Sequence, residues 1–336
     1  MPLFPPSPAA GQVPILNSAC PWASSEDDLR ALWDCEATSA VTTRTATLNG
    51  FADDPAKHQV TFFGPSAQSS SNSFGYSPFP LSQYLDWIRA FLSTASSEKK
   101  RSKQVIVSIT GNLDEMDEML AMLQQFADEQ GIVVAAEGNA SCPNFRGHPP
   151  PAYVESELAA FLAVLAKHAS ATLKVGVKLP PYTYDGQFDA VIRALSATAS
   201  TARTSQGEHP ISFLTATNTL GQGLVVGEQV IEVASSSIAQ KKKDDLFALP
   251  GGWGGLAGAA IHQTSLGNVY RLSILLNSSP DQRLKSISLV GVGGAHDAAS
   301  VERYRRVGAS AVACATALGR EGLAVFEQMA ASLSKL

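Results

Sequence analysis

The sequence predicts an α/β protein in which all 336 residues form a single (β/α)8 TIM barrel. Two observations indicate this fold class. Short apolar runs rich in β-branched residues alternate with segments of helical periodicity, as in a parallel sheet covered by helices. The chain contains eight such runs, and eight strand–helix repeats in a chain of this length are typical of a closed barrel. The runs are residues 13–17, 40–44, 104–110, 132–139, 174–180, 212–218, 287–292 and 311–316.

Four segments between these runs have a clear helical period. They are residues 24–37, 113–130, 154–169 and 298–309. Several carry acidic residues in the first turn, where a carboxylate interacts favourably with the helix dipole. We expect each segment to form a helix that covers the outside of the barrel.

Insertions are expected after the second, fourth and sixth strands. Residues 45–103 and 219–285 are too long to be simple helical crossovers, and long insertions in a compact domain are usually functional or disordered. The second insertion contains the strand-like run "EQVIEVA" (228–234) and the glycine-rich segment "GGWGGLAGAAIHQTSLGNV" (251–269). Glycines permit close approach of the backbone to a ligand. We expect residues 1–12 to be flexible and "KKKDD" (241–245) to be a solvated loop tip.

Composition excludes several classes of protein. The net charge is −5 and 16% of residues are charged, with no long basic stripe, which argues against nucleic acid as a partner. No apolar run is long enough to span a membrane, and the N-terminus shows neither a secretory signal nor an anchor. The four cysteines are far apart and have no metal-like spacing, as expected for free thiols in a reducing compartment. We therefore expect a cytoplasmic protein without a metal site.

Polar residues end most of the apolar runs. In a TIM barrel the C-terminal ends of the strands form the active site, so these residues are the first candidates. They are hydrogen-bond donors rather than acidic metal ligands, and such a ring suits an electron-rich, planar, oxygen-bearing ligand. For any one of Asn139, Asn144 and Asn218 taken alone, a loop residue that satisfies its own backbone is the better explanation. The residues that end the runs are Asn17, Arg44, Thr110, Asn139, Lys178 and Asn218.

Glycine-rich turns follow the last two strands. They are "GVGG" (291–294) and "ATALGREG" (315–322), and the loops after strands seven and eight are the usual phosphate site of this fold. Backbone N–H groups exposed by glycines and helix N-termini bind phosphate oxygens. An ordinary tight turn explains the first motif equally well on its own, but the two motifs together favour a phosphorylated ligand.

Lys178 and Cys142 are the strongest candidates for chemistry. A lysine inside a barrel strand is rare unless it has a partner or a function. Cys142 lies in "EGNASCPNFRG" (137–147), a polar loop with nothing apolar for a thiol to pack against. Pro143 favours an extended conformation of Cys142, which would present the sulfur from the loop. Of the histidines, only His262 lies in a candidate site loop.

These motifs together resemble the dihydroorotate dehydrogenases, specifically the soluble, single-subunit branch called class 1A. The resemblance covers most of the chain and is loosest at the N-terminus, where "ILNSA", "TTRTATL" and "NSFG" match. The membrane-bound class of the family has serine in place of Cys142 and an N-terminal anchor. The closest matches are "SITG", "EGNASCPN", "VGVKLPPY", "TNTLGQGL", the glycine-rich segment 251–269, "GVGG" and "ATALGREG".

The resemblance implies an FMN-dependent oxidation of (S)-dihydroorotate to orotate in pyrimidine biosynthesis. Cys142 falls at the position of the catalytic base, which removes the C5 proton while a hydride passes from C6 to flavin N5. Lys178 falls beside the flavin ring. The resemblance also implies fumarate as the electron acceptor and a homodimer.

Further site residues follow from the same resemblance. Those expected to bind the cofactor are Ser18, Ala19, Arg44, Asn112, Asn139, Lys178, Asn218, Gly254, Gly255, Gly293, Gly294, Ala315 and Thr316. Those expected to bind the substrate are Arg44, Asn72, Ser73, Phe74, Gly75, Asn139, Asn144, Asn218 and Thr219.

Several positions depart from the family pattern. The family has leucine in place of Gly138 and of Ala140, and we expect these smaller residues to enlarge the pocket beside Cys142. Two other functions therefore stay open: a related FMN oxidoreductase acting on a different enone or cyclic amide, and a non-catalytic flavin-binding scaffold. The remaining departures are Cys20 and Ala315 for glycine, Arg44 for lysine, Thr219 for serine, and His262 and Gln263 for Lys-Pro.

Overall fold

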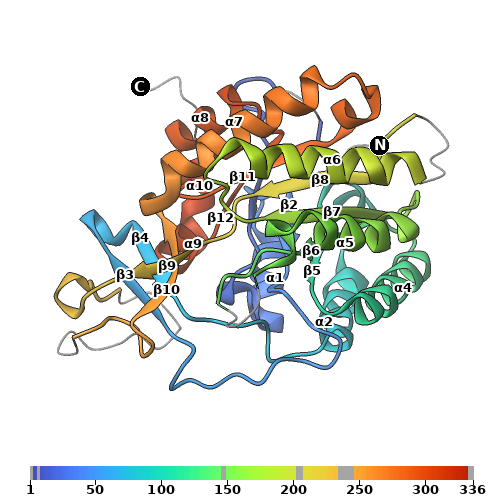
Figure 1. Ribbon diagram of the computed structural model, residues 1–336. Helices are drawn as coiled ribbons and strands as arrows, with labels where there is room; N and C mark the ends of the chain where they lie inside the picture. The colour runs from blue at the N-terminus through green and yellow to red at the C-terminus, as the bar shows by residue number, and fades with distance from the viewer. Residues whose placement is uncertain (1–2, 6–7, 145–148, 202–206, 234–245, 332–336) are drawn as a thin grey trace.

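A closed barrel of eight parallel strands forms the centre of the computed structural model (Figure 1). The structure describes the chain except residues 1–2, 6–7, 145–148, 202–206, 234–245 and 332–336. The first barrel strand pairs with both the last and the second, which closes the sheet. In hydrogen-bonded order the strands are β1 (Ile15–Asn17), β12 (Ala311–Cys314), β11 (Ser288–Val292), β8 (Ile211–Ala216), β7 (Leu173–Leu179), β6 (Val134–Asn139), β5 (Gln104–Ile109) and β2 (Ala40–Thr42). The predicted TIM barrel is confirmed, and each of the eight runs overlaps one barrel strand.

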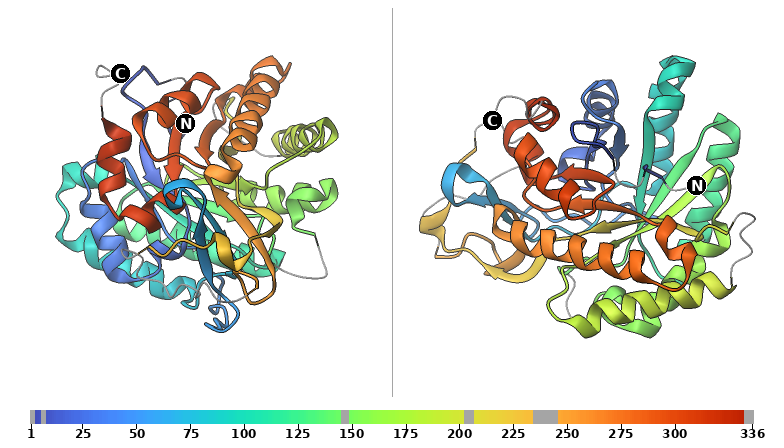
Figure 2. Two further views of the ribbon diagram at one scale, coloured as in Figure 1. Left: turned by 90° about the vertical axis from the view of Figure 1, so that its left-hand side faces the viewer. Right: turned by 90° about the horizontal axis from the view of Figure 1, so that it is seen from above.

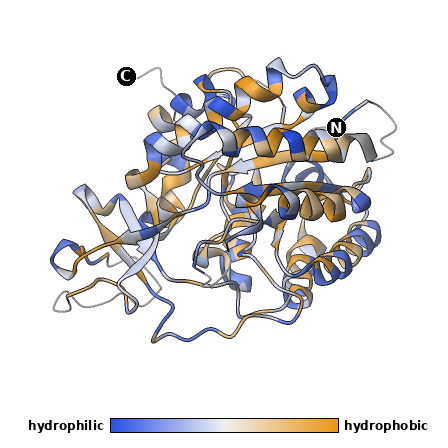
Figure 3. Ribbon diagram, in the orientation of Figure 1, coloured by the Kyte–Doolittle hydropathy of each residue, from blue (hydrophilic) through white to orange (hydrophobic). Residues whose placement is uncertain are grey.

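Helices surround the barrel, and Figure 3 shows that they carry both hydrophobic and hydrophilic residues. Three of the predicted helices begin with a capping box, at Ser25 before α1, Asn112 before α4 and Asp297 before α8. The four predicted helices are confirmed as α1, α4, α5 and α8. The α-helices are α1 (Glu26–Asp34), α2 (Leu81–Thr94), α3 (Ser97–Ser102), α4 (Leu113–Gln130), α5 (Glu155–His168), α6 (Asp185–Thr201), α7 (His262–Ser278), α8 (Ala298–Arg306), α9 (Thr316–Glu321) and α10 (Ala324–Ala330).

The barrel has two hydrophobic layers. The larger one lies between the outer faces of the strands and the helices, and the smaller one fills the barrel interior with side chains such as Leu16, Ile106 and Phe213. Phe4 belongs to the inner layer and is buried, and its backbone carbonyl accepts a hydrogen bond from Ser288 Oγ at 2.8 Å. The N-terminal segment, for which we expect flexibility, is thus attached to the barrel at this residue.

The insertions after the second and sixth strands meet in a four-stranded antiparallel sheet, here named the roof sheet. It lies to one side of the barrel in Figures 1 and 2. Its order is β3 (Val60–Phe63), β4 (Ser69–Asn72), β10 (Trp253–Gly258) and β9 (Leu220–Leu224). The sequence did not predict this sheet, because its central pair joins segments that are far apart in the chain.

Two smaller expectations concern the second insertion. The run 228–234 does not form the expected strand: residues Gly227–Gln229 form a 3-10 turn, and Val230 makes one isolated bridge to Phe63. A single bridge supplies too few backbone hydrogen bonds to extend the sheet. The charged run 241–245 lies outside the described residues.

The third insertion, after β6, contains the 3-10 turn Pro151–Tyr153.

Candidate active site

Two adjoining pockets lie at the C-terminal ends of the barrel strands. They enclose about 560 Å³ and about 720 Å³ of empty space, including the part open to solvent, and both volumes are typical of small-molecule sites. Residues such as Lys178, Asn218 and Thr316 line both, so the two pockets form one continuous crevice. We name them the glycine pocket and the cysteine pocket. The glycine pocket is lined by Ser18, Ala19, Gln68, Lys178, Thr217, Asn218, Thr219, Ala257, Gly258, Ile261, Val292, Gly293, Gly294, Ala295, His296, Ala315, Thr316, Ala317 and Arg320.

The cysteine pocket has walls from both the barrel and the roof sheet. Val60, Ser70, Asn72 and Ala257 line it from β3, β4 and β10. Alternate residues of a strand point to the same face of a sheet, so one face of the roof sheet covers this pocket. The full lining is Ala19, Cys20, Pro21, Trp22, Arg44, Thr45, Val60, Ser70, Asn72, Phe74, Gly75, Tyr76, Asn139, Cys142, Pro143, Asn144, Lys178, Asn218, Thr219, Ala257, Ala315 and Thr316.

The turn after β11 gives the glycine pocket its anion-binding character. Gly293 and Gly294 have φ of 133° and 73°, a region that favours glycine. The carbonyl oxygen of Gly293 accepts hydrogen bonds from Tyr304 Oη and His262 Nδ1, both at 2.7 Å. In a trans peptide the next N–H points the opposite way. The N–H of Gly294 is therefore directed away from these two side chains and is available to an anion.

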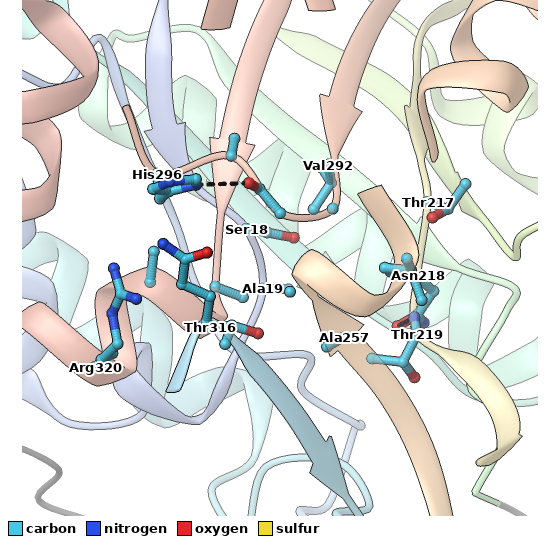
Figure 4. Close-up of a pocket in the computed structure, with 18 of the residues that line it drawn as sticks. Ser18, Ala19, Thr217, Asn218, Thr219, Ala257, Val292, His296, Thr316 and Arg320 are labelled. Carbon is cyan, nitrogen blue, oxygen red and sulfur yellow. Dashed lines mark hydrogen bonds between the residues drawn. The ribbon is translucent and has the colours of Figure 1, made fainter. Parts of the chain in front are cut away.

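Polar side chains complete the glycine pocket. Figure 4 shows Thr217 and Asn218 on one side of it and His296, Thr316 and Arg320 on the other. His296 Nδ1 bonds the carbonyl oxygen of Gly294 at 3.0 Å. An arginine and a histidine at this end suit a phosphate dianion.

Lys178 lies at the junction of the two pockets. It is 4% exposed, and its Nζ donates to Ser18 Oγ at 2.8 Å and to the carbonyl oxygen of Ala19 at 3.4 Å. Both acceptors are neutral oxygen atoms. A buried ammonium group held by neutral acceptors favours an electron-rich or anionic ligand beside it.

A network of amides lies between Lys178 and the loop of Cys142. Asn139 Nδ2 donates to Thr45 Oγ1 at 3.0 Å, and Asn218 Nδ2 donates to Asn139 Oδ1 at 3.3 Å and to Ser141 Oγ at 3.0 Å. The network joins Asn139, the last residue of β6, to Asn218, which follows β8, and these two strands flank β7. Their amides can exchange these bonds for those of a polar planar ligand.

A second network joins the Cys142 loop to the roof sheet. Asn144 Nδ2 donates to Asn72 Oδ1 at 3.2 Å and to the carbonyl oxygen of Phe74 at 2.7 Å. Asn72 Nδ2 in turn donates to the carbonyl oxygen of Gly255 at 3.4 Å. Asn144 therefore ties the loop that carries the thiol to the strands that cover the pocket.

Cys142 lies in the cysteine pocket with two cations nearby. Burial raises the pKa of its thiol to about 11, although the Asn144 backbone N–H and the charges of Lys178 and Arg44 act in the opposite direction. The thiol is therefore protonated at neutral pH when the pocket holds no ligand. The thiolate is the form of Cys142 that can accept a proton from a C–H group of a bound ligand. The charges of Lys178 and Arg44 stabilise this thiolate.

Arg44 also lines the cysteine pocket. Its guanidinium is buried, which lowers its pKa, and it lies 5.2 Å from the centre of the Phe74 ring. Its hydrogen bonds, to Ser24 Oγ at 3.5 Å and to the carbonyl oxygen of Gly75 at 3.4 Å, are long. Arg44 thus retains donor capacity for a carboxylate.

The structure brings most of the sequence-predicted site residues into the crevice, but four of them lie elsewhere. Asn112 caps helix α4 through a hydrogen bond from the Glu115 backbone N–H. Ser73 and Gly254 line neither pocket but a groove that adjoins the cysteine pocket at Pro143 and Asn144. Gly255 lines neither pocket; a Cβ there would lie 2.2 Å from Thr219 Oγ1, so it allows β10 to approach that residue. The glycine of this segment that lines the glycine pocket is Gly258, with φ of 71°.

The expectation that Gly138 and Ala140 enlarge the pocket beside Cys142 is wrong. A Cβ on Gly138 would lie 2.6 Å from Phe161 Cε1, so this position faces helix α5 on the outside of the barrel. Ala140 is buried in the outer hydrophobic layer. The residue between them, Asn139, faces inward, as the alternation of a strand requires.

Sequence reasoning missed several residues that line the crevice. Thr45 and Thr217 each lie next to a predicted site residue and just beyond the end of a barrel strand, so their position in the chain could have identified them. Tyr76 lies one residue after Gly75, and its hydroxyl has a raised pKa because it is buried. Arg320 lies within the predicted phosphate motif 315–322 and His296 lies two residues after "GVGG", so these motifs could have identified both, whereas the position of Trp22 had no distinctive sequence signal.

The described residues contain neither a candidate membrane-spanning helix nor a candidate metal-binding group. None of the helices there combines the length and the apolar character that a membrane span requires. That part of the chain also holds no group of three or more His, Cys, Asp or Glu side chains able to bind a metal ion.

Comparison with known proteins assigns the family. Residues 14–336 match the family described as dihydroorotate dehydrogenase. A protein of Streptococcus equi named "Putative dihydroorotate dehydrogenase A (fumarate)" is 29% identical over 323 residues, covering 96% of this chain and 88% of its own. Relatives of the same name in Streptococcus agalactiae and Streptococcus uberis are 27% and 26% identical, each covering 96% of this chain and 89% and 88% of their own. The chain therefore belongs to the dihydroorotate dehydrogenase family.

Proposed function

We propose that this enzyme oxidises (S)-dihydroorotate to orotate with FMN as cofactor, Cys142 as the base and fumarate as the electron acceptor. The observation that carries the proposal is the continuity of the crevice. Cys142 lies at one end, the glycine turn at the other, and Lys178 lines both pockets. A reaction that removes a proton and a hydride from one substrate needs a base and a redox cofactor on adjoining sides of that substrate.

Three features of the glycine pocket support FMN. His262 and Tyr304 donate hydrogen bonds to the Gly293 carbonyl oxygen, so the Gly294 N–H points the opposite way. This N–H can donate to a phosphate oxygen. A Cβ at Gly258 would lie 2.3 Å from the carbonyl oxygen of Gln68, so glycine is required for the pocket to keep its shape. Lys178 places a buried cation where it would stabilise negative charge on a reduced flavin ring.

In this proposal the protein binds dihydroorotate and accepts its C5 proton. Arg44 would bind the substrate carboxylate, for which a planar guanidinium is suited. The side chains of Asn72, Asn139, Asn144 and Asn218 would bind the pyrimidine oxygens and N–H groups. FMN, when bound, supplies the acceptor for the hydride from C6. The roof sheet would exclude water from the reacting atoms.

Cys142 would take the C5 proton onto its sulfur. Because the pKa of the thiol is about 11, the resting group is neutral, and the thiolate must form as substrate binds or as the reaction proceeds. Lys178 and Arg44 favour that thiolate. A loop position also lets the sulfur approach the bound substrate closely.

The acceptor and the assembly rest on the resemblance and on the names of the relatives. Fumarate appears in those names, and as a planar carboxylate it suits the Arg44 end of the cysteine pocket. We further propose a cytoplasmic homodimer that acts in pyrimidine biosynthesis.

The direct test is anaerobic mixing of the purified, FMN-loaded protein with dihydroorotate. We expect the flavin absorbance near 450 nm to bleach, and fumarate to restore it faster than NAD or a quinone. A protein that takes up no FMN, or whose bound FMN is not bleached, would contradict the proposal. Faster reoxidation by NAD or a quinone would contradict fumarate alone.

One observation favours a second candidate, a related FMN oxidoreductase acting on a different enone or cyclic amide. Arg44, Cys20 and Thr219 all line the cysteine pocket and all depart from the family pattern. Changes in the residues that line the substrate pocket are what a change of substrate requires. Under this alternative the bound flavin is not bleached by dihydroorotate but is bleached by another compound of that class.

A further inference from the structure

His262 lies behind the glycine turn rather than in the crevice. It is the first residue of α7, is 7% exposed, and does not line either pocket. Its Nδ1 bonds the carbonyl oxygen of Gly293 at 2.7 Å, and its Nε2 bonds Arg303 Nε at 3.0 Å. The imidazole thus connects helix α8 to the peptide of the turn.

The two partners determine the tautomer of His262. The Arg303 guanidinium is always charged and can only donate, so His262 Nε2 must accept. The ring proton is therefore on Nδ1, which donates to the Gly293 carbonyl. Burial, the largest influence, lowers the pKa of His262, and the neighbouring charge of Arg303 acts in the same direction. The neutral ring with this tautomer is the form that completes both bonds.

The contacts around this ring leave the turn little freedom. A Cβ on Gly294 would lie 2.9 Å from His262 Cβ, so the turn packs directly against the histidine. Tyr304 donates to the same Gly293 carbonyl at 2.7 Å and contacts the imidazole edge to face, with ring centres 5.5 Å apart. Helices α7 and α8 therefore hold the Gly293–Gly294 peptide from behind, on the side opposite its N–H.

We propose that His262 is a positioning residue for the cofactor phosphate. By fixing the Gly293 carbonyl it directs the Gly294 N–H towards the phosphate, and Arg303 keeps the ring in the tautomer that can do so. This inference rests on the proposed function, because it needs FMN as the ligand. It predicts that His262 contributes to the binding of FMN and not to that of riboflavin, which has the same ring system without the phosphate.

The experiment measures both dissociation constants in flavin-free, full-length protein by quenching of flavin fluorescence. We expect His262→Phe to weaken FMN binding roughly three- to tenfold, the cost of one hydrogen bond, and to leave riboflavin binding unchanged. His262→Gln can donate to Gly293 and accept from Arg303, so it should restore most of the FMN affinity. Tyr304→Phe removes the other donor to the same carbonyl and should weaken FMN selectively as well.

His209→Phe is the matched control for loss of a buried histidine. His209 is 4% exposed and likewise bonds through both ring nitrogens, to the carbonyl oxygen of Leu195 and the N–H of Ile211, each at 3.0 Å. It lines neither pocket. We expect this variant to lower the melting temperature without changing the ratio of the FMN and riboflavin dissociation constants.

Two results would overturn the inference alone: equal weakening of FMN and riboflavin by His262→Phe, or FMN affinity unchanged in that variant. Failure of His262→Gln to bind FMN better than His262→Phe would also count against it. A wild-type protein that binds no FMN would instead overturn the proposed function together with this inference. The wild-type measurement therefore separates the two failures.

Discussion

The two halves of the crevice are built differently. The glycine pocket uses the backbone of short turns, and the side chains that support its Gly293–Gly294 turn come from the adjoining helices α7 and α8. The cysteine pocket uses side chains, and its walls come from barrel ends, a loop and the roof sheet. Asn144 reaches Asn72 across 72 residues of sequence, and Asn72 reaches Gly255 across 183. The turn of the glycine pocket is thus held by nearby segments of the chain, whereas the walls of the cysteine pocket depend on the assembly of distant segments.

Replacing the proposed base, Cys142, should have the largest effect, and it should affect the cysteine pocket without affecting the glycine pocket. In Cys142→Ala we expect flavin reduction by dihydroorotate to slow roughly 100- to 10,000-fold, because the group proposed to take the proton is removed. FMN affinity should not change, since Cys142 does not line the glycine pocket. Stopped-flow absorbance measures the rate. Cys35→Ala, a free thiol outside both pockets, is the control, and equal rates in the two variants would refute the role of Cys142.

The pH dependence of flavin reduction tests the same half. The pKa of the Cys142 thiol is raised to about 11, and only the thiolate accepts a proton. The thiolate fraction therefore rises about tenfold for each pH unit below that value, so we expect the reduction rate to rise by about 100-fold between pH 7 and pH 9. A rate that is level over this range would mean that substrate binding itself deprotonates the thiol.

Gly294→Ala tests the other half. The residue has φ of 73°, and a Cβ would lie 2.9 Å from His262 Cβ and 3.0 Å from the carbonyl oxygen of Gly258. Strain of about 1–3 kcal/mol should weaken FMN binding roughly tenfold or more. Gly267→Ala, in α7 with no atom within 4 Å of its Cβ, should leave FMN binding unchanged. Equal FMN affinity in both variants would contradict a rigid turn.

Arg44→Lys gives the smallest expected effect and tests the substrate half alone. Lysine keeps the charge but loses the planar pair of donors, so we expect KM for dihydroorotate to rise about three- to tenfold. FMN affinity should stay the same, because Arg44 lines only the cysteine pocket. An unchanged KM in steady-state assays with fumarate would show that Arg44 does not bind the substrate.

The difference between the halves also explains what the sequence could predict. All eight barrel strands, and the turn at Gly293 and Gly294, could be predicted because each has a local pattern and parallel strands end at one edge of the sheet. The roof sheet was missed because β4 and β10 pair across a long stretch of chain. The prediction for Gly138 was wrong for a different reason. Gly138 precedes Asn139 in β6, and because adjacent strand residues face opposite sides, Gly138 faces helix α5 while Asn139 faces the pocket.

The roof sheet has a consequence for the order of folding. Pairing of β4 with β10 closes a far longer loop of chain than pairing of the neighbouring barrel strands β5, β6 and β7. Closing a longer loop costs more entropy and makes the pairing slower. We therefore expect these barrel strands to associate before the roof sheet pairs. At that stage the mouth of the barrel has no cover, so a large cofactor can enter without any later opening of the finished protein.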